Sequence, residues 1–545
     1  MAWLLGAAGV VCALAHADGL MLYSLDEVKN ATCAREMWRQ NNWIIPTFND
    51  GLRTDKPPLH YYFMIFAYSL FGPTAWAARL FSGVMGGASV MLTYLFGKRY
   101  LGHTSALWGA LILLASVHWA VQFHMSVPDP YLIFFMLAAL MAFYHGLQTR
   151  RSVYLLLMYA ALALGTLAKG PIALALPGLI MLLYLLFSRQ LRWPVLRQLH
   201  LPLGVLLYAA VVLPWYVLVH IHTDGAWTEG FFLKHNVGRF TDTMEGHGGI
   251  FLVTLAFVLG GMLPFSVYIP QALYDAYQHL RNPSTGQALG RSERRDVLLF
   301  LLVGAATIVI FFAISRTKLP NYTVPAYPLL ALLIGAFFRD RLKQDQQARL
   351  RPALWVYAGL ALLMPIAGYI GLSQDETVRD LNAWAFWLAL WPATAAGALW
   401  YSYRKKTQPG LKLLAAGHVV FVLLFFYIVY PPIDQRNPVA QSMHFIRQQD
   451  TAVVAYKQFN PAYVFHYGAP IRAYEKLESM QARALKEPIY IITRRKYIQA
   501  LVAALPAAQV VFRQRDTFER SKTAIIQAGP AFSAQEALPG GFSPE

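Results

Sequence analysis

Long apolar stretches separated by short polar connections fill most of the chain up to about residue 430. Stretches such as 104–121, 152–168 and 201–219 run for roughly 16–20 residues with almost no charge, close to the ~20 residues with which a helix crosses a bilayer. The pattern therefore predicts about thirteen membrane-spanning helices, in the order 2–17, 61–97 (one span with a lead-in), 104–124, 131–147, 152–168, 172–187, 201–221, 250–272, 297–314, 322–338, 353–372, 384–402 and 411–430.

The pattern changes after residue 430, where the chain becomes more polar. Short runs typical of β-strands occur in three places, 452–455, 489–492 and 509–512. Residues 495–505 lie between two of these runs and have helical apolar spacing. Strands that alternate with a helix in so short a segment predict a small α/β domain.

These patterns predict three regions. Residues 1–430 form an all-α, polytopic membrane domain whose long outer loops are 18–60 and 222–249. Residues 431–530 form the small α/β domain. Residues 531–545 contain Gly, Pro and Ser and are expected to be a disordered tail.

Composition excludes several other classes of protein. Of the 545 residues, 57% are hydrophobic and only 14% are charged, whereas a soluble domain is typically about 45–50% apolar and about 25% charged. A soluble multidomain enzyme and a disordered chain are therefore excluded. The two cysteines, Cys12 and Cys33, fall in a predicted span and in an outer loop, so neither a disulfide framework nor a zinc site is expected.

The net charge is +18, and the distribution of its basic residues indicates the membrane topology, not a binding partner. Basic residues concentrate in alternate connections, at 98–99, 150–151, 189–197, 281–295, 339–351 and 404–406. Because cytoplasmic loops carry the excess of Lys and Arg, these connections are predicted inside and the others outside. The N-terminus is then inside and residue 431 outside, and a nucleic-acid partner is not expected.

The first apolar stretch has two interpretations. Ala15-His16-Ala17 resembles a signal-peptide cleavage site, but no basic residue precedes the apolar run, as a signal peptide would require. A retained, rather short first helix is therefore favoured. In both cases Asp18 begins on the outer side, so the orientation of the later spans is the same.

Two adjacent acids, Asp26 and Glu27, stand where the chain leaves the membrane for the first outer loop. They are typical of the start of a solvated helix, because acids are favourable at helix N-termini. They would also suit a base at the mouth of a cavity. Residues 25–40 have the pattern of a helix lying along the membrane surface with its charges towards water.

Cations also occur on the predicted outer side, where the charge rule makes them scarce. Lys56 precedes Pro57 and Pro58, which fix its direction. The outer cations are Lys56, Lys169, Lys234, Arg239, Arg316 and Lys318. Together they indicate an anionic ligand in the outer leaflet, for which a lipid phosphate is the natural choice. The neighbouring acids Asp55 and Asp129 suggest chemistry on a hydroxyl or amine, although an aspartate between prolines is often only a turn residue.

The order of these motifs resembles GT-C glycosyltransferases. Leu25-Asp26-Glu27, Lys56-Pro57-Pro58-Leu59-His60-Tyr61-Tyr62, Ala168-Lys169-Gly170-Pro171 and Lys318-Leu319-Pro320-Asn321-Tyr322 follow one another as in that group, with His235 and Arg239 between the last two. The resemblance covers nearly all of 20–335. It is strongest to the protein O-mannosyltransferases and 4-amino-4-deoxy-L-arabinose transferases. Lys234 and Val28-Lys29-Asn30 depart from the family pattern.

The resemblance implies an inverting transfer of a sugar from a polyprenyl-phosphate donor to an acceptor outside the membrane. Asp26 is then the expected base, with Glu27 and Asp129 as further catalytic acids. The donor phosphate would be held by Lys56, Lys318 and Arg239, with Lys169 and Arg316 as further cations. Four residues are expected to position substrate, namely Asp55, His235, Tyr322 and Tyr62.

The resemblance also sets the expected compartment and partners. The expected location is a bacterial inner membrane, with the active site and the small C-terminal domain facing the periplasm. The partners would be membrane lipids, the polyprenyl-phosphate sugar donor and an acceptor. Lipid A is the favoured acceptor, and protein or another glycan is the alternative. No cofactor is required, and no spacing requires a metal, although the acids leave a divalent ion open. A transporter is the alternative of another class; it would need polar helices at mid-membrane and two related halves, neither of which is evident.

Overall fold

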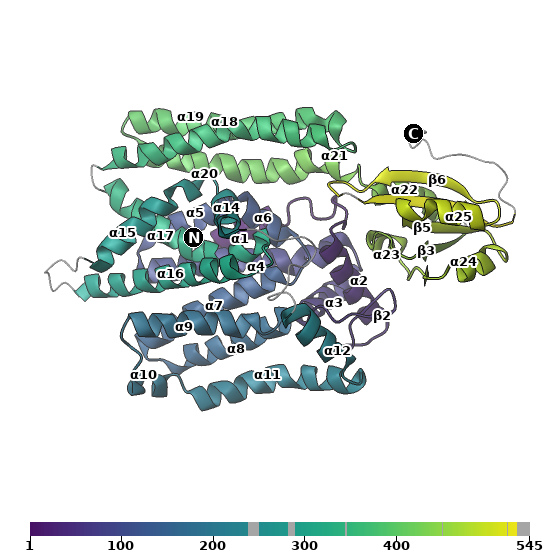
Figure 1. Ribbon diagram of the computed structural model, residues 1–545. Helices are drawn as coiled ribbons and strands as arrows, with labels where there is room; N and C mark the ends of the chain where they lie inside the picture. The colour runs from purple at the N-terminus through teal and green to yellow at the C-terminus, as the bar shows by residue number, and fades with distance from the viewer. Residues whose placement is uncertain (238–249, 282–288, 344–345, 449–450, 520, 531–545) are drawn as a thin grey trace.

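The computed structural model describes residues 1–237, 250–281, 289–343, 346–448, 451–519 and 521–530. Its first part is a bundle of helices that run roughly side by side, with a smaller sheet-containing part at one end (Figure 1). The α-helices of the bundle are α1 (Ala2–Ala13), α2 (Leu25–Arg39), α3 (Leu59–Phe71), α4 (Ala75–Tyr100), α5 (His103–Ala115), α6 (Val117–His124), α7 (Asp129–Thr149), α8 (Ser152–Lys169), α9 (Ile172–Phe187), α10 (Trp193–Gln198), α11 (Leu201–His222), α12 (Ala226–Glu229), α14 (Phe251–Gly261), α15 (Ile269–Arg281), α16 (Leu289–Ile314), α17 (Tyr327–Lys343), α18 (Arg351–Gln374), α19 (Leu390–Tyr403), α20 (Thr407–Leu424) and α21 (Tyr430–Asp434).

Tighter and wider helical turns connect several of these helices. The 3₁₀ turns are η2 (Phe265–Tyr268), η3 (Pro320–Ala326), η4 (Gln347–Leu350) and η5 (Arg379–Ala389), and the π-helical turns are η1 (Gly230–Val237) and η6 (Phe425–Val429). Two short strands, β1 (Thr47–Phe48) and β2 (Gly51–Leu52), form an antiparallel pair in the first long loop.

The chain is a multi-pass membrane protein. Eight described helices are long and apolar enough to cross a membrane, and two bent pairs raise that number to ten. Three shorter apolar helices, α1, α3 and α9, accompany them. The predicted total of thirteen spans also counts 2–17, 172–187 and 384–402, and that total stays a prediction.

The expected span 61–97 with its lead-in consists of two helices, the shorter α3 and the membrane-length α4. α3 ends at Phe71 and α4 begins at Ala75. Gly72 lies between them with φ +75°, a conformation that glycine adopts without the steric cost of a Cβ. The side chain of Thr74 then accepts a hydrogen bond from the Ala77 amide and caps α4.

Two other predicted spans are bent. The stretch 104–124 divides into α5 and α6, which meet at 66°, and Ser116 between them caps α6. The stretch 250–272 divides into α14 and the segment from η2 to α15, which meet at 115°. Apolar periodicity is continuous through both breaks, so the sequence pattern alone joins what the structure separates.

The second part of the molecule follows α21 and holds a five-stranded sheet. Its elements are α22 (Pro438–Gln448), β3 (Ala452–Tyr456), α23 (Ala462–Tyr467), β4 (Ala473–Tyr474), α24 (Leu477–Ala484), β5 (Ile489–Arg494), η7 (Arg495–Tyr497), α25 (Ile498–Ala504), β6 (Gln509–Arg515) and β7 (Lys522–Ala528). The strand order is β4-β3-β5-β7-β6, with β3 parallel to β4 and β5, and β7 antiparallel to its neighbours. The three strand-like runs read from the sequence lie in β3, β5 and β6. The predicted tail 531–545 lies outside the described residues.

The sheet-containing part is docked on α2 and the loop around it (Figure 1). The Arg35 guanidinium of α2 donates to the carbonyls of Phe465 and Val464 at 2.6 and 2.8 Å. Asn49 exchanges two hydrogen bonds with the backbone of Ile471, at 2.7 and 2.8 Å. Val28 and Met37 of α2 belong to one hydrophobic cluster with residues of both parts.

The predicted helix 25–40 is present as α2, but the expectation that its charges face water is wrong for three of them. Glu27, Arg35 and Glu36 are buried instead of facing water. The helix is wedged between the bundle and the sheet-containing part, so almost its whole circumference is covered. Its charges are therefore stabilised by specific partners within the protein, not by solvent.

Candidate active site

A small cavity brings together residues from five segments that are distant in sequence. Its volume is about 140 Å³. Its charged and polar lining consists of Asp55, Lys56, Asp129, Lys169, Ser315, Asn321 and Tyr322. Its apolar lining consists of Leu132, Ile133, Ile172, Phe231, Phe311, Phe312 and Pro325. Two cations and two carboxylates thus face a hollow with otherwise aromatic and aliphatic walls.

Asp129 and Lys169 form the centre of this polar group. Lys169 is the last residue of α8 and Asp129 the first of α7. The Lys169 ammonium lies 2.5 Å from Asp129 Oδ1, which also accepts a hydrogen bond from Asn321 Nδ2 at 2.8 Å. Lys169 Nζ also lies 5.4 Å from the centre of the Tyr322 ring. Asp129 is therefore engaged by a cation and an amide, which suits it to positioning more than to proton abstraction.

Gly170 allows an aromatic ring to approach the end of α8. Its φ is +99°, and a Cβ at this position would lie 2.6 Å from Cζ of Phe231. Phe231 stacks on Trp227 with ring centres 4.7 Å apart and lines the cavity. A side chain at Gly170 would therefore displace a wall of the cavity.

Lys56 and Asp55 reach the cavity from the segment that precedes α3. Lys56 is buried, and its charge acts on the Asp129 carboxylate and on His60. Asp55 lies 3.5 Å from Nε of Arg53. Arg53 is buried, and its Nη2 donates to Asn30 Oδ1 at 3.0 Å.

Asp26 is exposed in the first turn of α2 and does not line the cavity. Its charge and that of Asp55 both act on the Arg53 guanidinium. Arg53 therefore connects Asp26 electrostatically to the wall of the cavity. The exposure of Asp26 leaves it accessible to a second substrate arriving from water.

Glu27 has an environment very different from that of its neighbour Asp26. It is 3% exposed, and its two oxygens accept hydrogen bonds from Nε and Nη2 of Arg79 at 2.8 and 3.0 Å. The Ser126 amide donates a further bond to Oε1 at 2.9 Å. Arg79 Nη1 also donates to the carbonyls of Ala17 and Leu20. These contacts give Glu27 a structural function that holds the start of the outer loop.

Lys318 and Arg316 are placed differently from the two cavity lysines. Lys318 is buried, and its Nζ donates to the carbonyls of Ala313 and Ser315 at 3.0 and 2.6 Å, at the C-terminal end of α16. A cation is favourable there because of the helix dipole. Arg316 is exposed and does not line the cavity. Of this loop, Ser315, Asn321 and Tyr322 contribute to the cavity.

The remaining residues that were predicted to position substrate lie in different places. Tyr322 stacks on Phe312, with ring centres 4.9 Å apart, and lines the cavity. Tyr62 donates its hydroxyl proton to the Trp43 carbonyl at 2.6 Å and does not line it. Arg239 and the side chain of His235 lie outside the described residues.

The comparisons with known proteins agree with this architecture. The family model described as dolichyl-phosphate-mannose-protein mannosyltransferase matches residues 55–218. The undecaprenyl phosphate-alpha-4-amino-4-deoxy-L-arabinose arabinosyl transferase of Pseudomonas aeruginosa (strain LESB58) is 30% identical over 415 residues, which are 74% of this chain and 71% of the relative. This chain belongs to the same arabinosyl transferase family.

Other members of the family match a smaller part of their length. The transferase of Aeromonas salmonicida (strain A449) is 29% identical over 371 residues, covering 66% of this chain and 64% of that protein. The crystal structure of ArnT from Cupriavidus metallidurans bound to undecaprenyl phosphate superposes with a TM-score of 0.83, over 98% of this chain and 99% of that one. At 24% sequence identity, this superposition shows a common fold.

The structure also shows residues in or beside the cavity that were not predicted from the sequence as site residues. Asn321 belongs to a motif shared with the arabinosyl transferase family, but nothing local to it indicates the hydrogen bond to Asp129, 192 positions away. Arg53 does not line the cavity but lies beside it, and its position becomes visible only through its contacts with Asn30 and Asp55. In the sequence, only the aromatic character of Phe231 indicates that it could line a cavity.

One group of described side chains has the spacing of metal ligands, and it lies elsewhere. Atoms of Asp275, His279 and Asp340 come within 4.8 Å of one another. Arg341 donates to Asp275 Oδ1 at 2.5 Å, and Arg294 pairs with Asp340. α15, which carries two of the three, is at the end of the bundle away from the sheet-containing part (Figure 1). The carboxylates of the cavity are themselves paired with cations, Asp129 with Lys169 and Asp55 with Arg53.

Proposed function

We propose that this protein is a glycosyltransferase that moves 4-amino-4-deoxy-L-arabinose from undecaprenyl phosphate to lipid A, at the periplasmic face of a bacterial inner membrane. The names of its relatives supply the sugar and the carrier. The observation that carries the proposal is the cavity in which Lys56, Lys169, Asp55 and Asp129 meet.

The charges of the cavity match both parts of such a donor. The donor joins an anionic phosphate to a sugar with an amino group. Lys56 and Lys169 can contact the phosphate, and the carboxylates of Asp55 and Asp129 can receive the protonated amine. The apolar walls suit the isoprenoid next to the phosphate, since ligand sites are mostly apolar with a few convergent polar groups.

Lys56 and Lys169 would assist the departure of the leaving group. The bond between the anomeric carbon and the phosphate oxygen breaks, and its electron pair stays on the lipid phosphate, which gains negative charge. Cations fixed in a partly dry site stabilise that charge more strongly than water does. Their effect is larger in the transition state than in the ground state, which is the condition for raising the rate.

Asp26 would serve as the base. An oxygen of the acceptor attacks the anomeric carbon from the side opposite the phosphate, so one displacement inverts the configuration. The proton of that oxygen passes to the Asp26 carboxylate, which is exposed towards the incoming acceptor. Positioned general bases contribute about 10²–10⁴-fold to rates. Glu27 cannot do the same without losing its bonds to Arg79.

The orientation follows from charge and topology. The basic connections that the positive-inside rule places in the cytoplasm include those around α10 and α15. These elements lie at the end of the bundle away from the sheet-containing part (Figure 1). The small α/β domain, α2 and the cavity would therefore face the periplasm.

The test is transfer by the purified protein in nanodiscs, with undecaprenyl-phosphate aminoarabinose as donor and lipid A as acceptor. We expect Asp26→Asn to lower turnover at least about 100-fold with unchanged donor binding. Lys56→Ala should weaken donor binding and slow the release of the phosphate. Asp18→Asn, an exposed acid of the same loop, is the matched control and should keep normal turnover.

Two results would contradict the proposal. Near-normal turnover of Asp26→Asn would remove Asp26 as the base. A wild-type protein that consumes the donor only when envelope protein is present would favour protein as acceptor, the second candidate, which the mannosyltransferase description of the family model supports. A wild-type protein that never consumes the donor would refute a glycosyltransferase altogether.

A further inference from the structure

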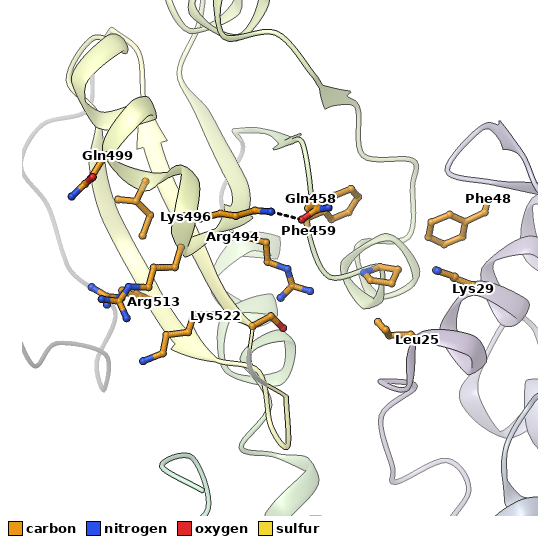
Figure 2. A pocket seen from close by; sticks show the side chains of 14 residues that line it. Leu25, Lys29, Phe48, Gln458, Phe459, Arg494, Lys496, Gln499, Arg513 and Lys522 are labelled. Atoms are coloured by element: carbon orange, nitrogen blue, oxygen red, sulfur yellow. Dashed lines mark hydrogen bonds between the residues drawn. The ribbon is translucent and has the colours of Figure 1, made fainter. Parts of the chain in front are cut away.

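A second and much larger cavity lies between the sheet-containing part and α2. Its volume is about 980 Å³. Six cations line it, namely Lys29, Arg494, Arg495, Lys496, Arg513 and Lys522. No aspartate or glutamate of the described residues is among the lining side chains. Figure 2 shows these side chains on both sides of the cavity, with Lys29 and Leu25 facing the sheet from α2. We call this cavity the basic cleft.

Most of the positive charge in the basic cleft is not neutralised by neighbouring acids. Arg494 pairs with the buried Asp516, and Lys522 lies 3.7 Å from Glu376. Among the described residues, no carboxylate lies within ion-pair distance of the other four cations. Lys496 donates to Gln458 Oε1 at 2.9 Å, which holds its ammonium without cancelling the charge. A cleft with this balance attracts anions.

The position of the basic cleft follows from the topology of the sheet. β3 and β5 are parallel neighbours, and the residues that follow them, Gln458 and Arg495, line the cleft. Crevices at the carboxyl ends of parallel strands are common ligand sites in α/β sheets. The opposite wall is the start of α2, where Leu25 lines the cleft immediately before Asp26.

We propose that the basic cleft binds the phosphorylated sugar head group of the acceptor and delivers its reacting oxygen to Asp26. This inference rests on the proposed function, because the acceptor must approach Asp26 from the side opposite the donor. The small cavity holds two lysines against two carboxylates, whereas the basic cleft holds a surplus of cations. The cleft therefore selects a ligand with several negative charges, such as a glycolipid with more than one phosphate.

The dimensions and the remaining lining fit that ligand. Sites for small molecules usually measure about 300–1,000 Å³, so the basic cleft can take more than one sugar ring. Phe48 and Phe459 supply apolar surface on which sugar rings can rest. Arg495 and Arg513 can each bind a phosphate with two parallel hydrogen bonds, a geometry that arginine offers and lysine does not.

The test measures acceptor binding separately from transfer. Full-length protein in phosphatidylcholine nanodiscs is titrated with lipid A that carries two phosphates and with its dephosphorylated form. We expect the dephosphorylated form to bind at least about tenfold more weakly, as loss of charge-assisted contacts implies. The double variant Arg495→Ala, Arg513→Ala should lose a similar factor for the phosphorylated form and raise its KM, while the KM of the donor and the melting temperature stay unchanged.

Matched controls and competitors decide the outcome. Lys476→Ala, Lys486→Ala removes two exposed cations of the same domain that do not line the cleft, and should leave acceptor binding unchanged. Equal binding of phosphorylated lipid A by wild type and by the Arg495, Arg513 variant would overturn the inference, even where transfer proceeds. Full displacement of lipid A by an equal concentration of soluble tripolyphosphate would overturn recognition of the head group. Phosphate-dependent binding without any transfer would support the cleft and refute the proposed function.

Discussion

The adjacent acids Asp26 and Glu27 give the sharpest test, because the structure places one in an exposed position and the other in a buried ion pair. Glu27→Gln keeps the size of the side chain but removes the charge that faces the Arg79 guanidinium. Glu27 accepts two bonds from Arg79 and one from the Ser126 amide. An amide in its place directs an NH₂ group at these donors and leaves the buried Arg79 without its hydrogen-bonded carboxylate.

The expected loss is large. Removing one partner of a buried ion pair typically costs about 3–5 kcal/mol, and both side chains of this pair are at most 4% exposed. Arg79 also holds the carbonyls of Ala17 and Leu20, so the start of the outer loop should loosen with it. We therefore expect a lower melting temperature and faster proteolysis within residues 18–60. The double variant Glu27→Leu, Arg79→Met should regain part of the stability, because neither charge is then buried alone.

The assay compares thermal unfolding, proteolysis of the loop and transfer in Glu27→Gln and Asp26→Asn. Asp26→Asn should unfold like the wild type and transfer no sugar. Glu27→Gln should unfold earlier, and its remaining folded fraction should still bind donor. A Glu27→Gln variant with an unchanged melting temperature and no transfer would refute this division and restore Glu27 as a catalytic acid.

Three further predictions concern the cavity and the docking of the domain. Asp129→Asn and Lys169→Met should each lower the rate of transfer and the affinity for the donor. In the double variant the loss of binding free energy should be smaller than the sum of the two single losses, and a double-mutant cycle measures this coupling. Strictly additive losses would contradict a joint function of the two residues. Arg35→Met removes two charge-assisted hydrogen bonds to backbone carbonyls, worth about 1.5–3 kcal/mol each. Limited proteolysis should therefore release the sheet-containing part earlier than in the wild type. Unchanged protection from the protease would contradict a docking function of Arg35. Burial lowers the pKa of His466 from 6.5 to about 4, so the unfolded chain binds more protons than the folded chain between these pH values. The free energy of unfolding should therefore fall by about 1 kcal/mol between pH 7 and pH 5.5. His466→Gln should remove this contribution from the pH profile of unfolding.

The sequence predicted the elements well where one local signal decided them. Apolar runs of membrane length placed α7, α8 and α9 within two residues of their observed ends. The breaks at Gly72 and Ser116 were missed because apolar periodicity continues on both sides of them. The pair Gly72-Pro73 is typical of a turn, but an analysis of long apolar runs gives one such pair little weight.

The candidate site was predictable in its chemistry and less so in its contacts. Positive charges on the outer side pointed to Lys56 and Lys169, and both line the cavity. The same reasoning pointed to Lys318, but its ammonium binds carbonyls three and five residues back at the end of α16. A count of charges cannot separate these outcomes, because they depend on which acceptor lies within reach of a folded side chain.

The helical geometry of α2 places the two adjacent acids in different environments. Successive residues on a helix point about 100° apart, so Asp26 and Glu27 cannot face the same neighbour. Glu27 faces the bundle, where Arg79 holds it, and this bond fixes the rotation of the helix about its axis. Fixing that rotation also fixes the direction of Asp26, which is exposed directly after Leu25, a residue that lines the basic cleft. The buried ion pair would thus set the position of the base between donor and acceptor. Loosening the pair should raise the KM of both substrates together. The double variant Arg495→Ala, Arg513→Ala should instead raise only the KM of the acceptor. A change confined to the donor in Glu27→Gln would refute this coupling.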